Sequence, residues 1–128
     1  KVDGATATYA SWTISLVGNA GTDGVNGRDY INGATTLVAG ITYDVDSSSG
    51  GFTATMPASP PVGASVTLVD PFGAWGTNDG ANSVTLARNG SNFINASGVG
   101  VAEDFTLNSS TAGLEITFIY TSTGWRAI

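Results

Sequence analysis

The feature that most constrains the fold of this chain is an alternation of apolar and polar residues that recurs along most of its length. The alternation has period two at residues 41–45, 52–56, 65–70, 83–88 and 114–121. In an extended chain, period two turns apolar side chains to one face and polar side chains to the other. Apolar residues at the helical spacings of three and four are nearly absent. The pattern predicts an all-β fold, an antiparallel, jelly-roll-like β-sandwich.

Turn residues between these segments predict how the strands connect. Residues 47–51 form the expected turn between strands 41–45 and 52–56, and the pair Asn89-Gly90 favours a type I′ hairpin. Residues 122–124 form a tight turn before a last strand at 125–128. The expected core takes the apolar face of each strand and consists of Leu37, Ile41, Tyr43, Val45, Phe52, Met56, Val66, Leu68, Val84, Leu86, Phe105, Leu107, Ile116, Phe118 and Tyr120.

Four glycines spaced three residues apart, Gly18, Gly21, Gly24 and Gly27, precede the β-rich part of the chain. Only glycine fits at the crowded axis where three extended chains wind together, so strict period three is typical of a collagen-like trimer. A glycine-rich linker is the alternative interpretation, because the triplets are few and contain no proline. We expect a Gly-X-Y neck or linker at residues 18–31, between an extended N-terminal arm at 1–17 and a β-sandwich domain at 32–128.

The N-terminal arm carries apolar residues that one extended segment cannot bury by itself. Around Trp12, Ile14 and Leu16 the arm alternates like a strand. Soluble monomers rarely expose large contiguous apolar patches. We therefore expect these three residues to lie between the chains of a parallel homotrimer, with the four spaced glycines close to the shared axis.

The charge balance argues against several classes of partner. The net charge is −6 and only 4 side chains are cationic, so we expect no nucleic-acid binding and no attraction to an anionic membrane surface. No apolar run approaches the roughly 18 residues that a membrane-spanning helix needs. The chain has no cysteine and no histidine, which removes thiolate ligands and the commonest general base. We expect no cofactor.

Paired carboxylates are the remaining route to catalysis, since two of them can hydrolyse a glycosidic bond. Asp44 and Asp46 alternate with apolar residues and so share one exposed strand face. Glu103 and Asp104 are adjacent, which sends them to opposite faces if their segment is a strand. The chain also lacks the long repeat of β-helical depolymerases. We expect no catalytic residue and no enzyme activity.

The Gly- and Asn-rich loop after strand 65–70 holds the best candidates for ligand binding. Asp70, Asn78 and Asp79 offer oxygen ligands of the kind that calcium takes, but their spacing matches no EF-hand, and we expect no metal. Trp75 beside Phe72 can stack on a sugar ring while Asn78 and Asp79 bind its hydroxyls, and loops on a rigid sandwich often carry function. The alternative is that Trp75 packs against the sandwich as a large hydrophobic residue.

From residue 36 onward the chain resembles a recurrent module of tailed-bacteriophage fibre proteins. The resemblance runs through LVAGITY at residues 37–43, FTATMPASP at 52–60, VGASVTLVD at 62–70, VTLARNG at 84–90, ITFIY at 116–120 and GWR at 124–126. In order, these pieces are spread over roughly two-thirds of the chain. The order and spacing of the pieces together carry the resemblance. Short Gly-X-Y stretches before such a module are also similar to phage fibres.

The resemblance implies a structural virion protein located on the extracellular particle. It implies a homotrimer that contacts other virion proteins and can attach to a glycan or protein of the host surface. Two alternatives stay open: a head or collar fibre or decoration protein without receptor binding, and a carbohydrate-binding module of a secreted protein.

Overall fold

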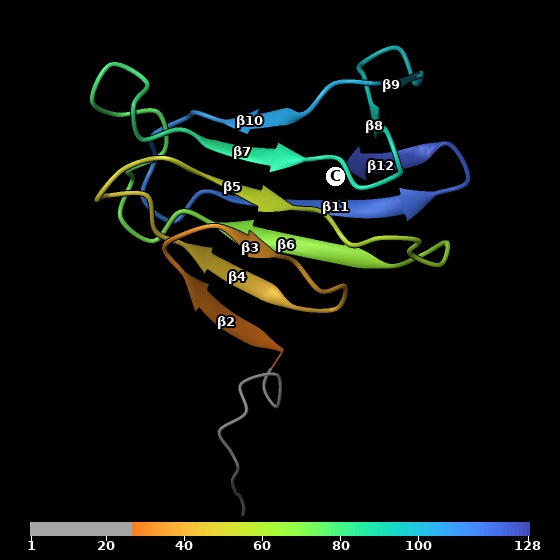
Figure 1. Cartoon of the computed structure of the whole chain (residues 1–128), viewed down its shortest axis with the longest axis horizontal. Helices are drawn as coiled ribbons and strands as arrows, with labels where there is room; N and C mark the ends of the chain where they lie inside the picture. The colour runs from red at the N-terminus through yellow and green to blue at the C-terminus, as the bar shows by residue number, and fades with distance from the viewer. Residues whose placement is uncertain (1–26) are drawn as a thin grey trace, which may run out of the picture.

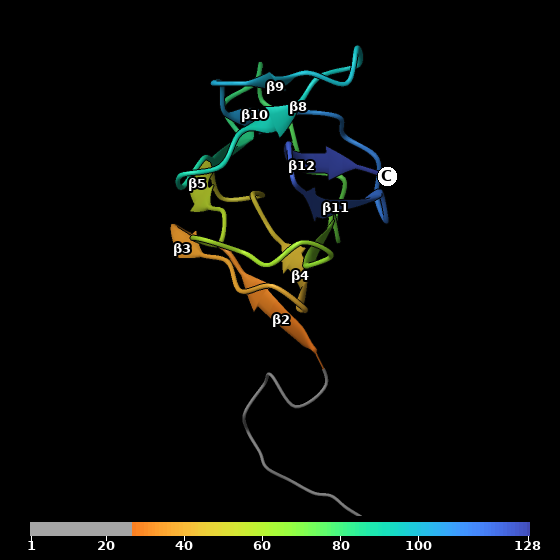
Figure 2. The same cartoon turned by 90° about the vertical axis from the view of Figure 1, so that its right-hand side faces the viewer.

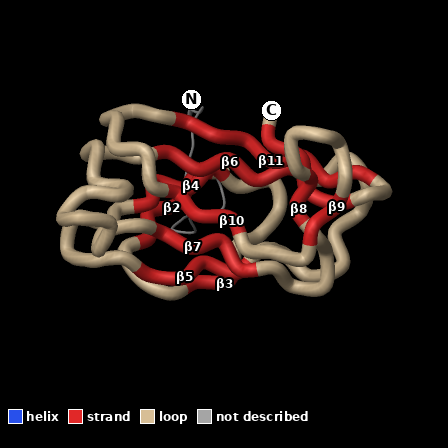
Figure 3. The backbone as a smooth tube through the Cα atoms, turned by 90° about the horizontal axis from the view of Figure 1, so that it is seen from above, coloured by secondary structure: helices blue, strands red, loops and turns tan. Residues whose placement is uncertain are grey.

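The computed structural model describes residues 27–128, which form strands and turns without a helix. The strands in this part of the chain make two sheets, of order β10-β7-β5-β3 and β2-β4-β6-β11-β12-β8-β9. Figures 1 and 3 show the sheets as two layers of a sandwich. The strand bounds are β2 Arg28–Ile31, β3 Thr35–Thr36, β4 Thr42–Val45, β5 Phe52–Thr55, β6 Ser65–Val69, β7 Val84–Ala87, β8 Phe93–Ile94, β9 Gly100–Val101, β10 Phe105–Leu107, β11 Glu115–Thr121 and β12 Gly124–Ala127.

In the first half of the domain the chain winds back and forth between the two sheets, and we call this arrangement the coil. Consecutive strands from β2 to β7 alternate between the two sheets, so β2, β4 and β6 stack in parallel, as do β3, β5 and β7 (Figure 2). The stacking is in register: Asp29 pairs with Tyr43, and Tyr43 pairs with Leu68. The second half reverses direction, because β10 and β11 run antiparallel to β7 and β6.

The predicted all-β sandwich is confirmed, but the predicted antiparallel pairing is wrong in part. Of the nine strand pairs within residues 27–128, five are parallel and the sheets are mixed. The physical reason lies in the connections. After each of these strands the chain crosses to the opposite sheet. When it comes back to the first sheet it runs in its original direction, so neighbouring strands there are parallel.

Residues 47–51, expected as the turn between two strands, show such a connection. Ser47 is fully buried, and the chain crosses from β4 in one sheet to β5 in the other. Gly51 makes the crossing possible, because a Cβ there would lie 2.2 Å from the Ser83 carbonyl oxygen. Asn89-Gly90 likewise joins strands of different sheets, β7 and β8, and no type I′ hairpin forms. The expected tight turn between β11 and β12 is confirmed.

The core lies between the two layers. All the residues expected there are buried or packed against the buried cluster. The core also takes in Ile31, Ala54, Trp75, Phe93 and Trp125. Three rings close one part of it: Phe93, Phe105 and Phe118 pack with centroids 5.1 to 5.7 Å apart.

The β domain begins earlier than the sequence pattern predicts. Residues 28–31 lie within the segment expected as neck or linker, yet they form β2 and pair with β4. Gly27 adopts φ +66°, and its carbonyl oxygen accepts a hydrogen bond from the Thr42 amide at 2.7 Å. Gly27 therefore belongs to the start of the sandwich. The other residues expected at the trimer interface lie outside the described residues: Trp12, Ile14, Leu16, Gly18, Gly21 and Gly24.

Candidate functional site

A buried carboxylate organises the loop that follows β6. Asp70 is fully buried at the end of the strand. Its Oδ1 accepts hydrogen bonds from the amides of Ala74 at 3.0 Å and Phe72 at 3.4 Å, and its Oδ2 accepts one from the Trp75 amide at 3.1 Å. Charge-assisted bonds of this kind are stronger than neutral ones. The carboxylate therefore folds residues 70–75 into a tight loop and directs Trp75 inward.

Trp75 is a core residue, which agrees with the alternative interpretation that it packs against the sandwich. The side chain is 1% exposed, and its Nε1 donates a hydrogen bond to the Val45 carbonyl oxygen at 2.9 Å. The indole is therefore not exposed on the outer surface of the loop, where the sequence pattern placed it for stacking on a sugar. The physical reason is the preceding Asp70, whose bonds to the loop amides turn the chain back onto the sandwich.

The other three predicted ligand-binding residues remain on the surface of the same loop. Phe72 is 65% exposed, and Asn78 and Asp79 are exposed at positive φ of +57° and +54°. Asn and Asp tolerate this left-handed conformation better than most residues. The structure thus keeps an exposed ring and two polar side chains on this loop, without the indole.

The carboxylates considered for catalysis or metal binding make structural contacts. Asp44 forms a two-point ion pair with Arg28, at 2.6 and 2.9 Å. Asp46 accepts hydrogen bonds from the hydroxyls of Ser48 at 2.6 Å and Tyr30 at 2.5 Å. Both bonds favour the ionised form, so they lower the pKa of Asp46, with the Ser48 bond as the larger cause. The bond to Asp46 raises the pKa of Tyr30.

The remaining acidic candidates lie apart from one another. The Asp104 carboxylate accepts a hydrogen bond from the Arg88 amide at 2.9 Å and lies 3.6 Å from the Arg88 guanidinium. Glu103 is exposed. Within residues 27–128, no group of three or more acidic side chains gathers as a metal site. No described helix is long and apolar enough to cross a membrane.

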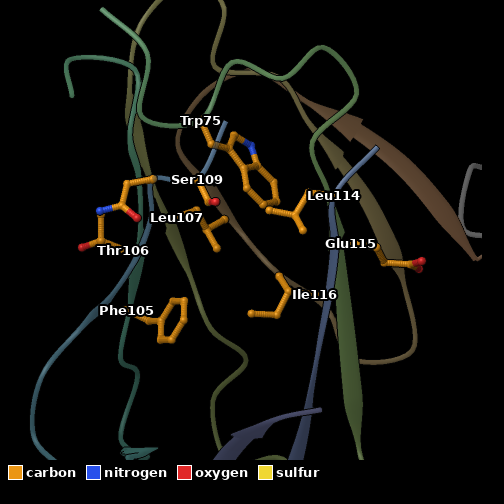
Figure 4. A pocket seen from close by; sticks show the side chains of 9 residues that line it. Trp75, Phe105, Thr106, Leu107, Ser109, Leu114, Glu115 and Ile116 are labelled. Atoms are coloured by element: carbon orange, nitrogen blue, oxygen red, sulfur yellow. The ribbon is translucent and has the colours of Figure 1, made fainter. Parts of the chain in front are cut away.

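A hollow between the two sheets is the site that the sequence pattern did not reveal. It has a volume of about 250 Å³ and lies between β10 and β11, beneath the loop that carries Trp75 (Figure 4). Leu107 from β10 and Ile116 from β11 point into it, whereas Glu115 points away. Its other lining residues are Trp75, Phe105, Thr106, Asn108, Ser109 and Leu114. The floor is apolar and the rim carries hydroxyl and amide groups.

The hollow opens between the edge strand β10 and the first residues of β11. β12 pairs with β11 only from Phe118 onward, and the Ile128 amide bonds to the Thr117 carbonyl oxygen at 2.8 Å. Among the described residues, Glu115 and Ile116 have no strand partner on that side. β10 is the edge of its own sheet, so both sides of the opening present an unpaired stretch of backbone. A small ligand there can contact apolar side chains and backbone polar groups together.

Comparison with known proteins gives no family for the chain. No family model matches it, and no curated protein sequence matches it.

Proposed function

We propose that this chain is a fibre domain of a tailed bacteriophage, a non-enzymatic structural component of the virion. In this proposal three copies assemble in parallel, with residues 18–26 as a Gly-X-Y neck. The domain contacts other virion proteins, and it attaches to a glycan or protein on the host surface.

The observation that carries the proposal is that the two edges of the sandwich differ, since parallel strands form one edge and antiparallel strands form the other. Strands β2 and β3, where the described chain begins, form one edge of the sandwich, and β8, β9 and β10 close the opposite edge (Figure 1). Coiled β architectures grow along one axis and need a closed end. A stack of parallel strands that is closed at one edge by antiparallel strands suits the end of a fibre. The resemblance of residues 36–126 to a fibre module supports the same assignment.

The surface chemistry favours attachment at the end formed by the loops after β6 and β10. These loops pack side by side, since a Cβ at Gly76 would lie 2.1 Å from the Asn108 carbonyl oxygen. They carry the exposed Phe72 and border the hollow at Ser109. A rigid pair of loops with one exposed ring and a small apolar hollow is a suitable contact for one sugar ring or one apolar side chain.

Light scattering coupled to size-exclusion chromatography tests the trimer with the full 128-residue chain. We expect three times the chain mass of 12.9 kDa. Gly21→Val and Gly24→Val should weaken the trimer and leave the circular dichroism of the β domain unchanged. A monomeric mass for the wild-type chain contradicts the proposal and makes residues 18–26 a linker.

Binding of the trimer to candidate host cells and to a glycan array tests the attachment role. Ser109→Trp fills the rim of the hollow and should abolish binding, whereas Ser122→Trp, exposed in the β11–β12 turn, should not. If wild-type trimer binds no host cell or glycan, the domain is a head or collar fibre or decoration without receptor binding.

A further inference from the structure

The outer faces of the two sheets differ in charge. On the seven-stranded sheet, the outward residues include Arg28 and Asp44 as an ion pair, Glu115, and Arg126. On the four-stranded sheet, the outward residues of all four strands are uncharged. They are Thr36, Thr53, Thr55, Thr85, Ala87 and Thr106, opposite in alternation to the buried Ala54, Leu86 and Leu107.

These uncharged residues form two rows across the strands. Thr53 pairs with Thr85, and Thr85 pairs with Thr106, which makes a row of three threonines. Thr36 pairs with Thr55, and Thr55 pairs with Ala87, which makes a second row. We call these six residues the threonine face.

The border of the threonine face includes a further uncharged residue. Val38 follows Thr36 at the next outward position and is 59% exposed. At one end of the face, Arg88 and Asp104 form an ion pair with 3.6 Å between the guanidinium and the carboxylate. The face itself offers methyl and hydroxyl groups and no charged side chain.

We propose that the threonine face is the surface by which each copy packs against its neighbours in the trimer, an inference that rests on the proposed fibre function. Each copy carries a net charge of −6, so association is easiest when charged faces point to solvent. Of the two outer faces in residues 27–128, that of the four-stranded sheet carries no charged strand residue and can turn inward without burying a charge. Burying unpaired charges is costly.

Threonine is suited to such a contact. Its methyl group supplies apolar area, and its hydroxyl can donate or accept, so threonine can serve on either side of a contact between copies. The protein already uses this bond within one copy, where the hydroxyls of Thr67 and Thr117 lie 2.9 Å apart on neighbouring strands. Cross-strand threonine pairs stabilise sheets in the same way.

Charge insertion on one face or the other tests the assignment. Thr53→Arg and Thr85→Arg place a cation in the middle of the threonine face, and three copies then bring three like charges together. We expect the mass in solution to fall from the trimer value to one third of it. Thr67→Arg is the matched control, because Thr67 occupies a central strand on the outer face of the other sheet. It should keep the trimer mass.

Circular dichroism confirms that each variant is folded, and thiol labelling gives a second readout if an arginine variant fails to fold. The chain has no cysteine, so Thr53→Cys and Thr67→Cys each introduce a single reactive thiol. Thr53 is exposed in one copy and Thr67 is half-buried, so we expect the thiol at position 53 to label more slowly than the thiol at 67 only if the trimer covers it.

The outcomes separate the two proposals. A wild-type trimer that survives Thr53→Arg and Thr85→Arg, or whose position 53 labels as fast as position 67, overturns the threonine face and leaves the fibre proposal intact. A wild-type monomer overturns the trimer itself. Loss of host-cell binding from an intact Thr53→Arg trimer would assign the face to the host ligand and would also overturn this inference.

Discussion

Removing the Asp70 carboxylate should destabilise the domain strongly, because buried amides depend on it. Ala74 and Trp75 both donate buried backbone hydrogen bonds to this carboxylate, at 3.0 and 3.1 Å. A buried donor left without an acceptor costs about 1–3 kcal/mol. Asp70→Ala orphans two of them, so the free energy of unfolding should fall by about 2–6 kcal/mol. Domains of this size are stable by only about 5–15 kcal/mol.

Asp70→Asn should fall between the wild type and Asp70→Ala. The amide side chain keeps one oxygen for the Ala74 amide but turns an NH₂ group toward the Trp75 amide, where an acceptor is needed. Urea unfolding followed by tryptophan fluorescence measures all three proteins. Glu103→Ala, at an exposed residue, is the control and should change stability by no more than about 0.5 kcal/mol. If Asp70→Ala is as stable as that control, the carboxylate does not organise the loop.

Two further outcomes follow from the structure. Gly51→Ala should be clearly destabilising because its Cβ would meet the Ser83 carbonyl oxygen, whereas Gly33→Ala, with nothing within 4 Å, should be neutral or slightly stabilising in thermal unfolding. Asp46 contributes stability above its unfolded-state pKa, because the Ser48 hydroxyl lowers its folded-state pKa from 3.8. That contribution should disappear as the pH falls through the lowered value, and the stability advantage over Asp46→Asn should shrink in acid titrations.

The alternation in the sequence predicts which side of each strand is buried, and the structure confirms it. Val66 and Leu68, or Val84 and Leu86, are inward because their neighbours are polar, and this information is local. The β11–β12 turn is local as well, because only two residues separate paired strands. Such features depend on residues that are close together in the chain, so a single sequence suffices to find them.

The position of Trp75 could not be predicted from alternation, because it depends on contacts made at a distance. Its Nε1 partner is the Val45 carbonyl oxygen, 30 residues away. One local signal existed: an aspartate directly after a strand, followed by a glycine-containing loop, can satisfy several loop amides at once. The hollow was beyond prediction for a similar reason. It depends on how β10 and β11, which belong to different sheets, approach each other beneath the loop that carries Trp75.

The division between a charged face and a threonine face shows why topology had to be known before the outer surface could be interpreted. Alternation alone places Asp44 and Thr53 on equivalent outward positions of successive strands. Because the chain changes sheet at Gly51, the two residues end on opposite sides of the molecule. A hairpin at that position would have put the two strands side by side and mixed their outward residues on one surface. Because successive strands belong to alternate sheets, the charged outward residues lie on the seven-stranded sheet. The four-stranded sheet keeps an uncharged outer face although the net charge of the chain is −6.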